Sequence, residues 1–488
     1  MMYKMRGRSA VAYALVCALS ITLSSCSGSG GTMPQVPGQS SQTVQSAQSL
    51  GLQSERHVGD VDDLRHIKHF VVIYQENWSF DALYAEIPGA NGYGPGRNAY
   101  QVDKSGNPLA SIPQPLDYNG NPDPRFPASL PDQTYDLAPY VPPSGTTGDL
   151  IHRFYHEQLQ IDGGTMDKFV TWSDNGGLTL SEYDASSLPE GLLAQKYTIA
   201  DNFFHSAFGG SFLNHQFLIC ACAPPWPGAP PSYISNPDPN NLNDNHVTPD
   251  GYAVNTSYST YSPHPAGIPA ADLVPPQTNP TIGDRLSDAG VSWKWYSGGW
   301  NNAIAGNPDP LFQFHHQPFA YYKNYADGTA ARQAHLRDET EFFTDVQNGT
   351  LPDVVFIKPI GAGNEHPGYT SLLEGQQHVQ LLVQTIRHSK YWHDTAIIIT
   401  YDENGGRWDH VGPPKVDRWG PGSRVPAVVV SHFARKHYVD HTQYETLSII
   451  RTLELRYGLK PLTSRDELAA PMLNAFDFRD HDDRDDPE

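Results

Sequence analysis

Five short apolar runs divide the chain, and each of them ends in polar residues. They cover residues 67–74, 291–296, 353–358, 395–400 and 424–430. Continuous runs rich in Val, Ile, Phe and Tyr are typical of strands that are buried on both faces of a sheet. We interpret these five runs as strands of one central sheet.

Two further segments are predicted to be helices that alternate with these strands. One covers residues 371–388 and opens on a capping box formed by Ser371 and Glu374. The other covers residues 442–457, with Thr442 and Glu445 as its capping pair. Alternating strands and helices predict an α/β fold, in which three layers (α/β/α) surround a central, mostly parallel sheet.

Two long stretches lack such patterns. Residues 87–148 and 223–280 are rich in Pro, Asn, Tyr and Gly, which favours irregular loops. We expect them to be insertions that cover a functional site and not separate domains. On this interpretation residues 62–476 form one domain.

Carboxylates follow two of the predicted strands. Asp402 and Glu403 come directly after residues 395–400, and Glu76 with Asn77 follows residues 67–74. Ligands of open α/β sheets bind at the carboxyl ends of the strands. Adjacent carboxylates repel each other unless a cation or a proton neutralises them, and carboxylate and amide oxygens suit a divalent cation. The pattern predicts a metal site, although each segment alone could be an ordinary charged turn.

Ser211 is the candidate nucleophile. It follows Gly209 and Gly210 and precedes an apolar, helical run at residues 212–222. The free N–H groups and the dipole of a helix N-terminus favour an anion there. The alternative interpretation is a serine that only caps the helix.

The formal net charge of −21 over 488 residues restricts the possible partners. It argues against nucleic acid and against electrostatic docking on anionic lipid. An anionic substrate would need a metal or a histidine cluster that reverses the field locally. Part of the acid excess lies in residues 477–488, which we expect to be a solvated acidic tail.

The first residues have the features of a targeting segment. Three basic residues precede the apolar residues 11–23, and Leu23-Ser-Ser-Cys26 resembles a bacterial lipobox. We expect residues 1–25 to be a lipoprotein signal peptide, Cys26 to be lipidated and residues 26–61 to be a flexible tether. The alternative is cleavage and secretion. Either route places the protein outside the cytoplasm, in the periplasm or on the outer membrane, with membrane contact through the lipid anchor only.

Two other cysteines lie in the apolar run after Ser211. Cys220 and Cys222 would point in different directions on a continuous helix. We therefore predict buried free thiols in place of a disulfide or a metal pair.

Five separated motifs together resemble a known family. They are QENWSFD at 75–81, DLIHRFYHEQLQIDGGTMDKF at 149–169, ADNFFHSAFGGSFLNHQ at 200–216, EHP at 365–367 and YDENGGRWDHV at 401–411. This series resembles the bacterial phosphoesterase family of phospholipases C and acid phosphatases, a branch of the alkaline-phosphatase-like superfamily. The resemblance covers residues 66–462. GGSFLNHQ and a chain that ends soon after the helix at 442–457 look more like the acid phosphatases, since phospholipases C of the family carry further carboxy-terminal β-rich domains.

The resemblance implies a role for each matching residue. One divalent cation would be bound by Glu76, Asn77, Ser211 and Asp402, and its identity stays open. His152 and His366 match the histidines that contact phosphate. Glu403 stands where acid phosphatases of this type often have an aspartate, and either it or a histidine would give a proton to the leaving group. We place His156 behind His152 as a supporting residue and expect Asp409 and His410 to brace a loop.

Three functions remain open on the sequence. The first is an acid phosphatase that cleaves small phosphate monoesters through a phosphoserine intermediate. The second is a phospholipase C-type phosphodiesterase that acts on phospholipid head groups. The third, from another class, is a surface lipoprotein that binds a metal without catalysis.

Overall fold

The computed structural model describes residues 61–479. Its largest element is a sheet of eight strands in the order β13-β6-β12-β11-β1-β10-β8-β9, and only β12 runs antiparallel to its neighbours. The fold is therefore α/β with a mostly parallel sheet, as predicted. The strands are β1 (His69–Gln75), β6 (Thr198–Ala200), β8 (Trp293–Ser297), β9 (Leu336–Asp338), β10 (Val354–Lys358), β11 (Thr395–Tyr401), β12 (Ala427–Ser431) and β13 (Tyr438–Asp440).

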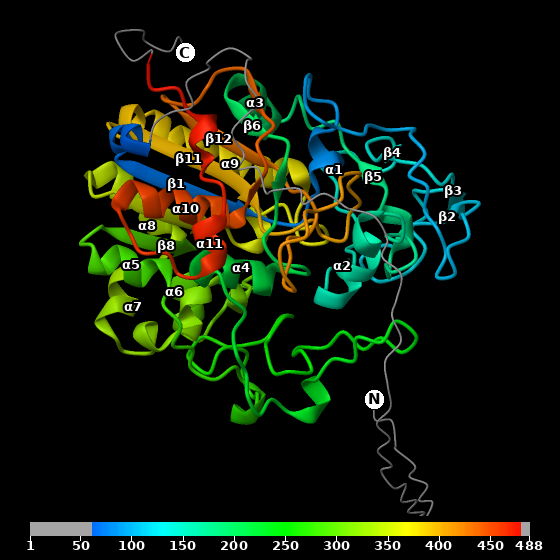
Figure 1. Cartoon of the computed structure of the whole chain (residues 1–488), viewed down its shortest axis with the longest axis horizontal. Helices are drawn as coiled ribbons and strands as arrows, with labels where there is room; N and C mark the ends of the chain where they lie inside the picture. Colours follow the sequence, from blue (N-terminus) through cyan, green and yellow to red (C-terminus); the bar gives the residue numbers. More distant parts are fainter. Residues whose placement is uncertain (1–60, 480–488) are drawn as a thin grey trace, which may run out of the picture. The chain divides into compact units, whose positions relative to one another are not determined.

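Helices cover the sheet in two groups (Figure 1). Strands β10 and β11 are buried along their whole length, which requires cover on both faces. One group packs α9 (Leu372–Arg387) against α3 (Pro189–Lys196) and α8 (Glu339–Asn348). The other packs α4 (Ser211–Cys220) against α5 (Ile282–Asp288) and α10 (Thr446–Tyr457).

The remaining elements are short. The helices are α1 (Phe80–Tyr84), α2 (Phe154–Ile161), α6 (Trp300–Ile304), α7 (Ala330–His335) and α11 (Ser464–Leu468). Three two-stranded pairs join β2 (Ile112–Pro113) to β3 (Ser129–Leu130), β4 (Tyr135–Asp136) to β5 (Ser181–Glu182), and β7 (Phe203–Phe204) to β14 (Tyr444–Glu445). Residues 87–148 and 223–280 consist mainly of turns and loops, which confirms that they are irregular.

The register of the central strands aligns their carboxyl ends. Ile73 of β1 pairs with Ile357 of β10 and with Ile399 of β11, and Gln75 pairs with Tyr401. The residues that follow these pairs therefore leave the sheet at one edge. This edge carries both carboxylate motifs of the sequence.

One predicted helix cap is confirmed and one is wrong. The side chains of Ser371 and Glu374 form the predicted capping box of α9. Helix α10, in contrast, begins at Thr446, and its capping box is formed by Glu445 and Ser448. The predicted pair is displaced because Tyr444 and Glu445 are held in β14, which pairs with β7.

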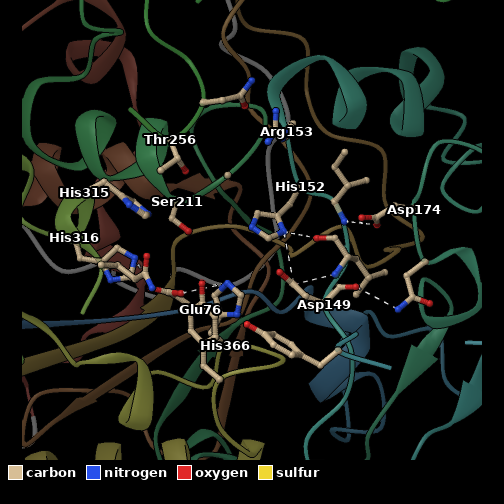
Figure 2. Close-up of a pocket in the computed structure, with 18 of the residues that line it drawn as sticks. Glu76, Asp149, His152, Arg153, Asp174, Ser211, Thr256, His315, His316 and His366 are labelled. Carbon is tan, nitrogen blue, oxygen red and sulfur yellow. Dashed lines mark hydrogen bonds and ion pairs between the residues drawn. The ribbon is translucent and has the colours of Figure 1, made fainter. Parts of the chain in front are cut away.

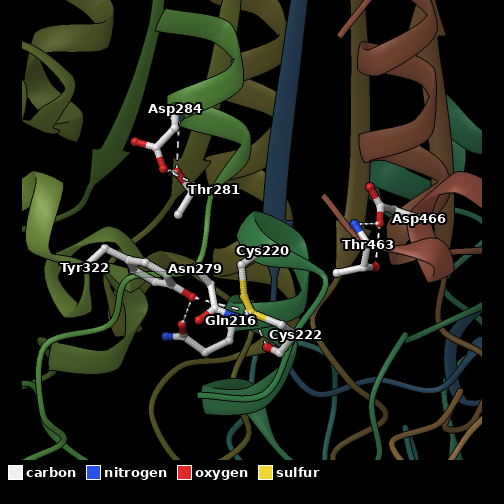
Figure 3. Close-up of a disulfide and its surroundings, with 9 residues drawn as sticks. All are labelled: Gln216, Cys220, Cys222, Asn279, Thr281, Asp284, Tyr322, Thr463 and Asp466. Carbon is white, nitrogen blue, oxygen red and sulfur yellow. Dashed lines mark hydrogen bonds between the residues drawn. A yellow bond between two sulfur atoms is a disulfide. The ribbon is translucent and has the colours of Figure 1, made fainter. Parts of the chain in front are cut away.

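The two cysteines after Ser211 form a disulfide, so the prediction of free thiols is wrong (Figure 3). Helix α4 ends at Cys220, and Ala221 adopts a left-handed conformation with φ 51°. This residue turns the chain back and brings the Cα atoms of Cys220 and Cys222 within 5.2 Å. The prediction failed because it assumed that the helix continues to residue 222.

Several predictions fall on residues that the structure does not describe. The signal peptide at 1–25, lipidation of Cys26, nearly all of the tether at 26–61 and residues 480–488 of the acidic tail lie outside the described residues. Within residues 61–479, no helix has the length and apolar character needed to cross a membrane.

Candidate active site

A cavity of about 660 Å³ opens at the carboxyl edge of the sheet (Figure 2). Both insertions contribute to its walls, through residues such as Tyr118 and Thr256. Four of the predicted site residues line it: Glu76, His152, Ser211 and His366. Three others, Asn77, Asp402 and Glu403, are fully buried next to these and do not line the cavity.

Ser211 is the first residue of α4, and Gly210 is the N-cap. The Ser211 hydroxyl opposes the rise in the pKa of the buried Asp402 carboxyl, and no side chain caps the helix. The turn before it needs glycine: Gly209 has φ +87°, and a Cβ there would lie 2.6 Å from the backbone nitrogen of Phe154. A Cβ at Gly210 would lie 2.7 Å from the carbonyl oxygen of His152. The serine turn therefore packs directly on the segment that carries His152.

Glu157 was not among the predicted site residues, and its side chain binds the turn at Gly209 that precedes Ser211. It is buried on α2, and its Oε2 accepts a hydrogen bond of 2.6 Å from the N–H of Gly209. Its Oε1 lies 2.9 Å from His205 Nε2 and accepts bonds from the backbone N–H and hydroxyl of Ser423 at 2.9 and 3.1 Å. Burial raises its pKa, but His205 and the hydrogen bonds outweigh this and hold the pKa below its usual value.

Glu76 and Asp402 both form an ion pair with the buried ammonium group of Lys358. Lys358, the last residue of β10, places its Nζ 2.8 Å from Glu76 Oε1 and 3.3 Å from Asp402 Oδ2. Burial raises the pKa of Glu76, but His316 and Lys358 outweigh it and hold the pKa well below the usual range. Burial raises the pKa of Asp402, and Lys358 opposes that rise.

Three histidines that sequence reasoning missed surround these carboxylates. His315 and His316 close a short 3₁₀ turn and line the cavity, and His215 lies one helical turn after Ser211 on α4. His316 Nε2 is 2.7 Å from Glu76 Oε1, and its ring stacks on that of His215 at 4.9 Å. Burial lowers the pKa of all three, that of His316 to about 4, so they are neutral near pH 7.

His152 and His366 are oriented alike. Each Nδ1 lies 2.6 Å from a backbone carbonyl oxygen, that of Leu150 and that of Pro367. Their Nε2 atoms face the carboxylates: His152 is 3.6 Å from Glu403 Oε1, and His366 is 3.8 Å from Glu76 Oε2. Figure 2 shows both rings directed into the cavity, on the side opposite His315.

The donor set fits a divalent cation. Asn77 Oδ1, Asp402 Oδ1 and Glu403 Oε1 are buried without a hydrogen-bond partner, which is costly unless something else binds them. One ligand atom from each of His215, His316 and Asp402 lies within 4.8 Å of the others, a group that could hold a metal ion. Buried oxygen and imidazole ligands of this kind suit hard or borderline divalent metals.

Other predicted residues lie apart from this cluster. His156 Nδ1 is 3.0 Å from Asp244 Oδ2, and the residue does not line the main cavity. Asp409 binds the guanidinium of Arg424 at 2.8 Å, and His410 Nδ1 is 2.7 Å from Asp81. Arg424 also contacts Asp81 of α1 at 3.0 Å, so Asp409 and His410 brace the loop after β11 against this helix, as predicted.

Comparison with known proteins identifies the family. The model of the Phosphoesterase family matches residues 67–460. The chain belongs to this family. Phosphoesterase relatives include phospholipase C B of Mycobacterium tuberculosis, 24% identical over 85% of this chain and 78% of that protein. The non-hemolytic phospholipase C of Burkholderia pseudomallei is 26% identical over 84% of this chain and 57% of that protein.

Two further similarities cover less of the chain. Non-specific phospholipase C1 of Arabidopsis thaliana is 32% identical over 30% of this chain and 34% of that protein. Among solved structures, the match to an alkaline phosphatase superfamily protein from Vibrio parahaemolyticus covers 67% of this chain and 75% of that protein's chain. It has 11% identity and a TM-score of 0.30.

Proposed function

We propose that this phosphoesterase is a phospholipase C-type phosphodiesterase with Ser211 as its nucleophile. The observation that carries the proposal is Ser211 at the N-terminus of α4, beside the buried Asp402 carboxyl and open to a cavity lined by histidines. The names of the relatives favour this function over the acid phosphatase expected from the sequence. A phosphomonoesterase is the second candidate, since the GGSFLNHQ motif at 209–216 supports it. A nucleophile open to a cavity speaks against a non-catalytic metal-binding lipoprotein.

The proposed reaction has two steps. The Ser211 hydroxyl loses its proton to solvent, its Oγ bonds to phosphorus, and the bond from phosphorus to the departing alcohol oxygen breaks. Water then attacks the phosphoserine, which restores the Ser211 hydroxyl and releases the phosphorylated head group. The free N–H groups at the start of α4, with His152 and His366, stabilise the charge on the phosphoryl oxygens.

The departing alcohol needs a proton. Burial and the neighbouring Asp402 raise the pKa of Glu403 well above its usual range, which favours the protonated form of this carboxyl. His152 lies between Glu403 and the cavity, 3.6 Å from the carboxyl. It is therefore placed to pass the proton to the leaving oxygen.

The buried ligands complete the centre. We propose that Glu76, Asn77, Asp402 and Ser211 would hold one divalent cation. When bound, it supplies positive charge that favours the deprotonated form of the serine hydroxyl.

The cavity walls favour a cationic head group. Three tyrosines and three aspartates line it, against one arginine, Arg153. Aromatic faces and carboxylates attract a quaternary ammonium ion. The lining residues in question are Tyr118, Tyr258, Tyr369, Asp117, Asp149 and Asp174.

Substrate preference tests this proposal. We expect nitrophenyl phosphorylcholine to be cleaved with a higher kcat/KM than nitrophenyl phosphate. Tyr118→Ala should raise KM for the choline ester by about 3- to 30-fold, the size of a lost cation–π contact, and leave the monoester unaffected. Tyr100→Ala is the matched control, because Tyr100 is an exposed tyrosine of the same insertion outside the cavity. Preference for the monoester would identify a phosphomonoesterase instead.

Glu157 should matter for turnover as well as for stability. In Glu157→Gln, an NH₂ group can face the N–H of Gly209, and the charge opposite His205 is lost. We expect the free energy of unfolding to fall by about 1 to 3 kcal/mol, the cost of leaving buried hydrogen-bond partners of the carboxylate unsatisfied. We also expect kcat to fall by roughly 10- to 100-fold with KM nearly constant, because the Ser211 turn loses its position.

Chemical denaturation and steady-state kinetics measure both effects. Glu454→Gln is the control, because Glu454 is also buried but pairs with Arg451 on α10, away from the cavity. Equal kcat values for Glu157→Gln and wild type would show that the turn does not depend on Glu157.

A further inference from the structure

A lysine occupies the centre of the carboxylate cluster. The side chain of Lys358 is fully buried, and its Nζ contacts Glu76 and Asp402 at 2.8 and 3.3 Å. It also donates a hydrogen bond of 3.3 Å to the carbonyl oxygen of Gln75 and lies 5.3 Å from the centre of the Tyr74 ring. The ammonium group thus stands between two residues of the ligand set proposed for the metal.

The backbone of Lys358 is fixed by the sheet. It ends β10 and pairs with Ser297 of β8, while the preceding Ile357 pairs with Ile73 of β1. Its side chain therefore starts from the same edge as Glu76 and Asp402. The contact between them follows from the register of the strands and not from a loop that could take another path.

We propose that Lys358 is the internal counter-ion of the metal centre, which holds Glu76 and Asp402 together without a metal and weakens the binding of a divalent cation. The inference rests on the proposed function only in taking these two carboxylates as metal ligands. The divalent cation could then leave while the ion pairs with Lys358 keep Glu76 and Asp402 in position.

Electrostatics gives the reason for both effects. Two buried carboxylates repel each other strongly in a medium of low dielectric constant, and the ammonium offsets that repulsion. A divalent cation bound to the same carboxylates adds two positive charges a few ångströms from the ammonium. The attraction of the cation to the carboxylates is then partly offset by its repulsion from Lys358.

Histidines also surround the carboxylates that Lys358 contacts. His215, His315 and His316 are all buried around the cluster, and burial is the largest cause that lowers the pKa of each. Lys358 adds to this lowering of the pKa at all three, while Glu76 opposes it at His315 and His316. His366 also faces Glu76. Lys358 is the fully buried ammonium group that a divalent cation at Glu76 and Asp402 would meet.

The test is metal binding, measured without turnover. Purified protein is stripped with EDTA, dialysed and titrated with Mn²⁺ by calorimetry. Lys358→Met should bind Mn²⁺ at least about tenfold more tightly than wild type, because the competing charge is gone while the carboxylates remain. Its melting temperature without metal should fall, and added Mn²⁺ should raise it more than in wild type.

Two further variants make the result decisive. Lys294→Met is the matched control, since Lys294 on the neighbouring strand β8 forms an ion pair of 2.5 Å with Asp345, which is not among the proposed ligands. It should lower stability without changing Mn²⁺ affinity. Lys358→Gln keeps hydrogen-bond donors without the charge and should behave like Lys358→Met if the latter does not fold.

Equal or weaker Mn²⁺ binding by the Lys358 variants would overturn the proposal. Its failure is distinct from failure of the proposed function, because binding is measured without a phosphate ester. A wild-type protein that hydrolyses no phosphate ester would refute the function and leave the binding result intact.

Discussion

Ser211→Ala should remove nearly all hydrolysis while the protein stays folded. Loss of a nucleophile commonly lowers kcat by about 10⁴- to 10⁶-fold. The remaining cavity, with its histidines and helix N-terminus, can still bind a phosphate group, so binding should survive. Ser211 is only 6% exposed and its methyl replacement fits, because the close packing of the turn involves Gly209 and Gly210.

Steady-state kinetics, together with circular dichroism and phosphate binding, measure this outcome. Ser464→Ala provides the control, because Ser464 is also the first residue of a helix, α11, but does not line the cavity. Brief reaction with substrate, followed by acid quench and mass spectrometry, should detect a phosphoserine at Ser211 in wild type. Activity of Ser211→Ala within about tenfold of wild type would mean that another group attacks phosphorus.

The central strands could be predicted because they are buried on both faces. A parallel strand in this position needs apolar side chains throughout, and the runs at 67–74, 353–358 and 395–400 match β1, β10 and β11 within two residues. The edge strands β9 and β13 read LRD and YVD. Such short, polar strands are defined by pairing with their neighbours, and no local pattern marks them.

The candidate site was predicted where it follows directly from the strands. Glu76 and Asp402 leave β1 and β11 at one edge, and the register brings them together. Lys358 ends β10 in the same way, but a lysine after an apolar run resembles an ordinary strand end. His315 and His316 come from a short turn inside an irregular region, where nothing in the spacing indicates that the chain returns to the sheet.

Helix ends account for the two clearest errors. Ala221 adopts the left-handed conformation that is usually found at Gly or Asn. Because Ala is not typical of this position, the sequence did not indicate that α4 ends before Cys222. Thr442 has the side chain of a good N-cap, but pairing of Tyr444 with Phe203 delays α10. Both errors arise because tertiary contacts outweigh local preferences.

Asp402→Asn should lose metal and activity together. A carboxamide still offers an oxygen but no charge to balance a divalent cation. The change also leaves the Lys358 ammonium with one carboxylate in place of two, so positive charge in the cluster is less well compensated. The Ser211 hydroxyl loses the negative charge of the neighbouring carboxylate at the same time.

We expect Mn²⁺ affinity of Asp402→Asn to fall by about 100-fold or more, beyond the 10- to 100-fold typical of residues that only support a ligand. His366→Ala should keep the metal and lower kcat by roughly 10²- to 10⁴-fold, the loss expected for a group that stabilises charge on the phosphoryl oxygens. Elemental analysis of each purified variant beside its kcat separates the two effects. If Asp402→Asn keeps both metal and rate, the cation is bound elsewhere; if His366→Ala loses the metal, this histidine belongs to the ligand set.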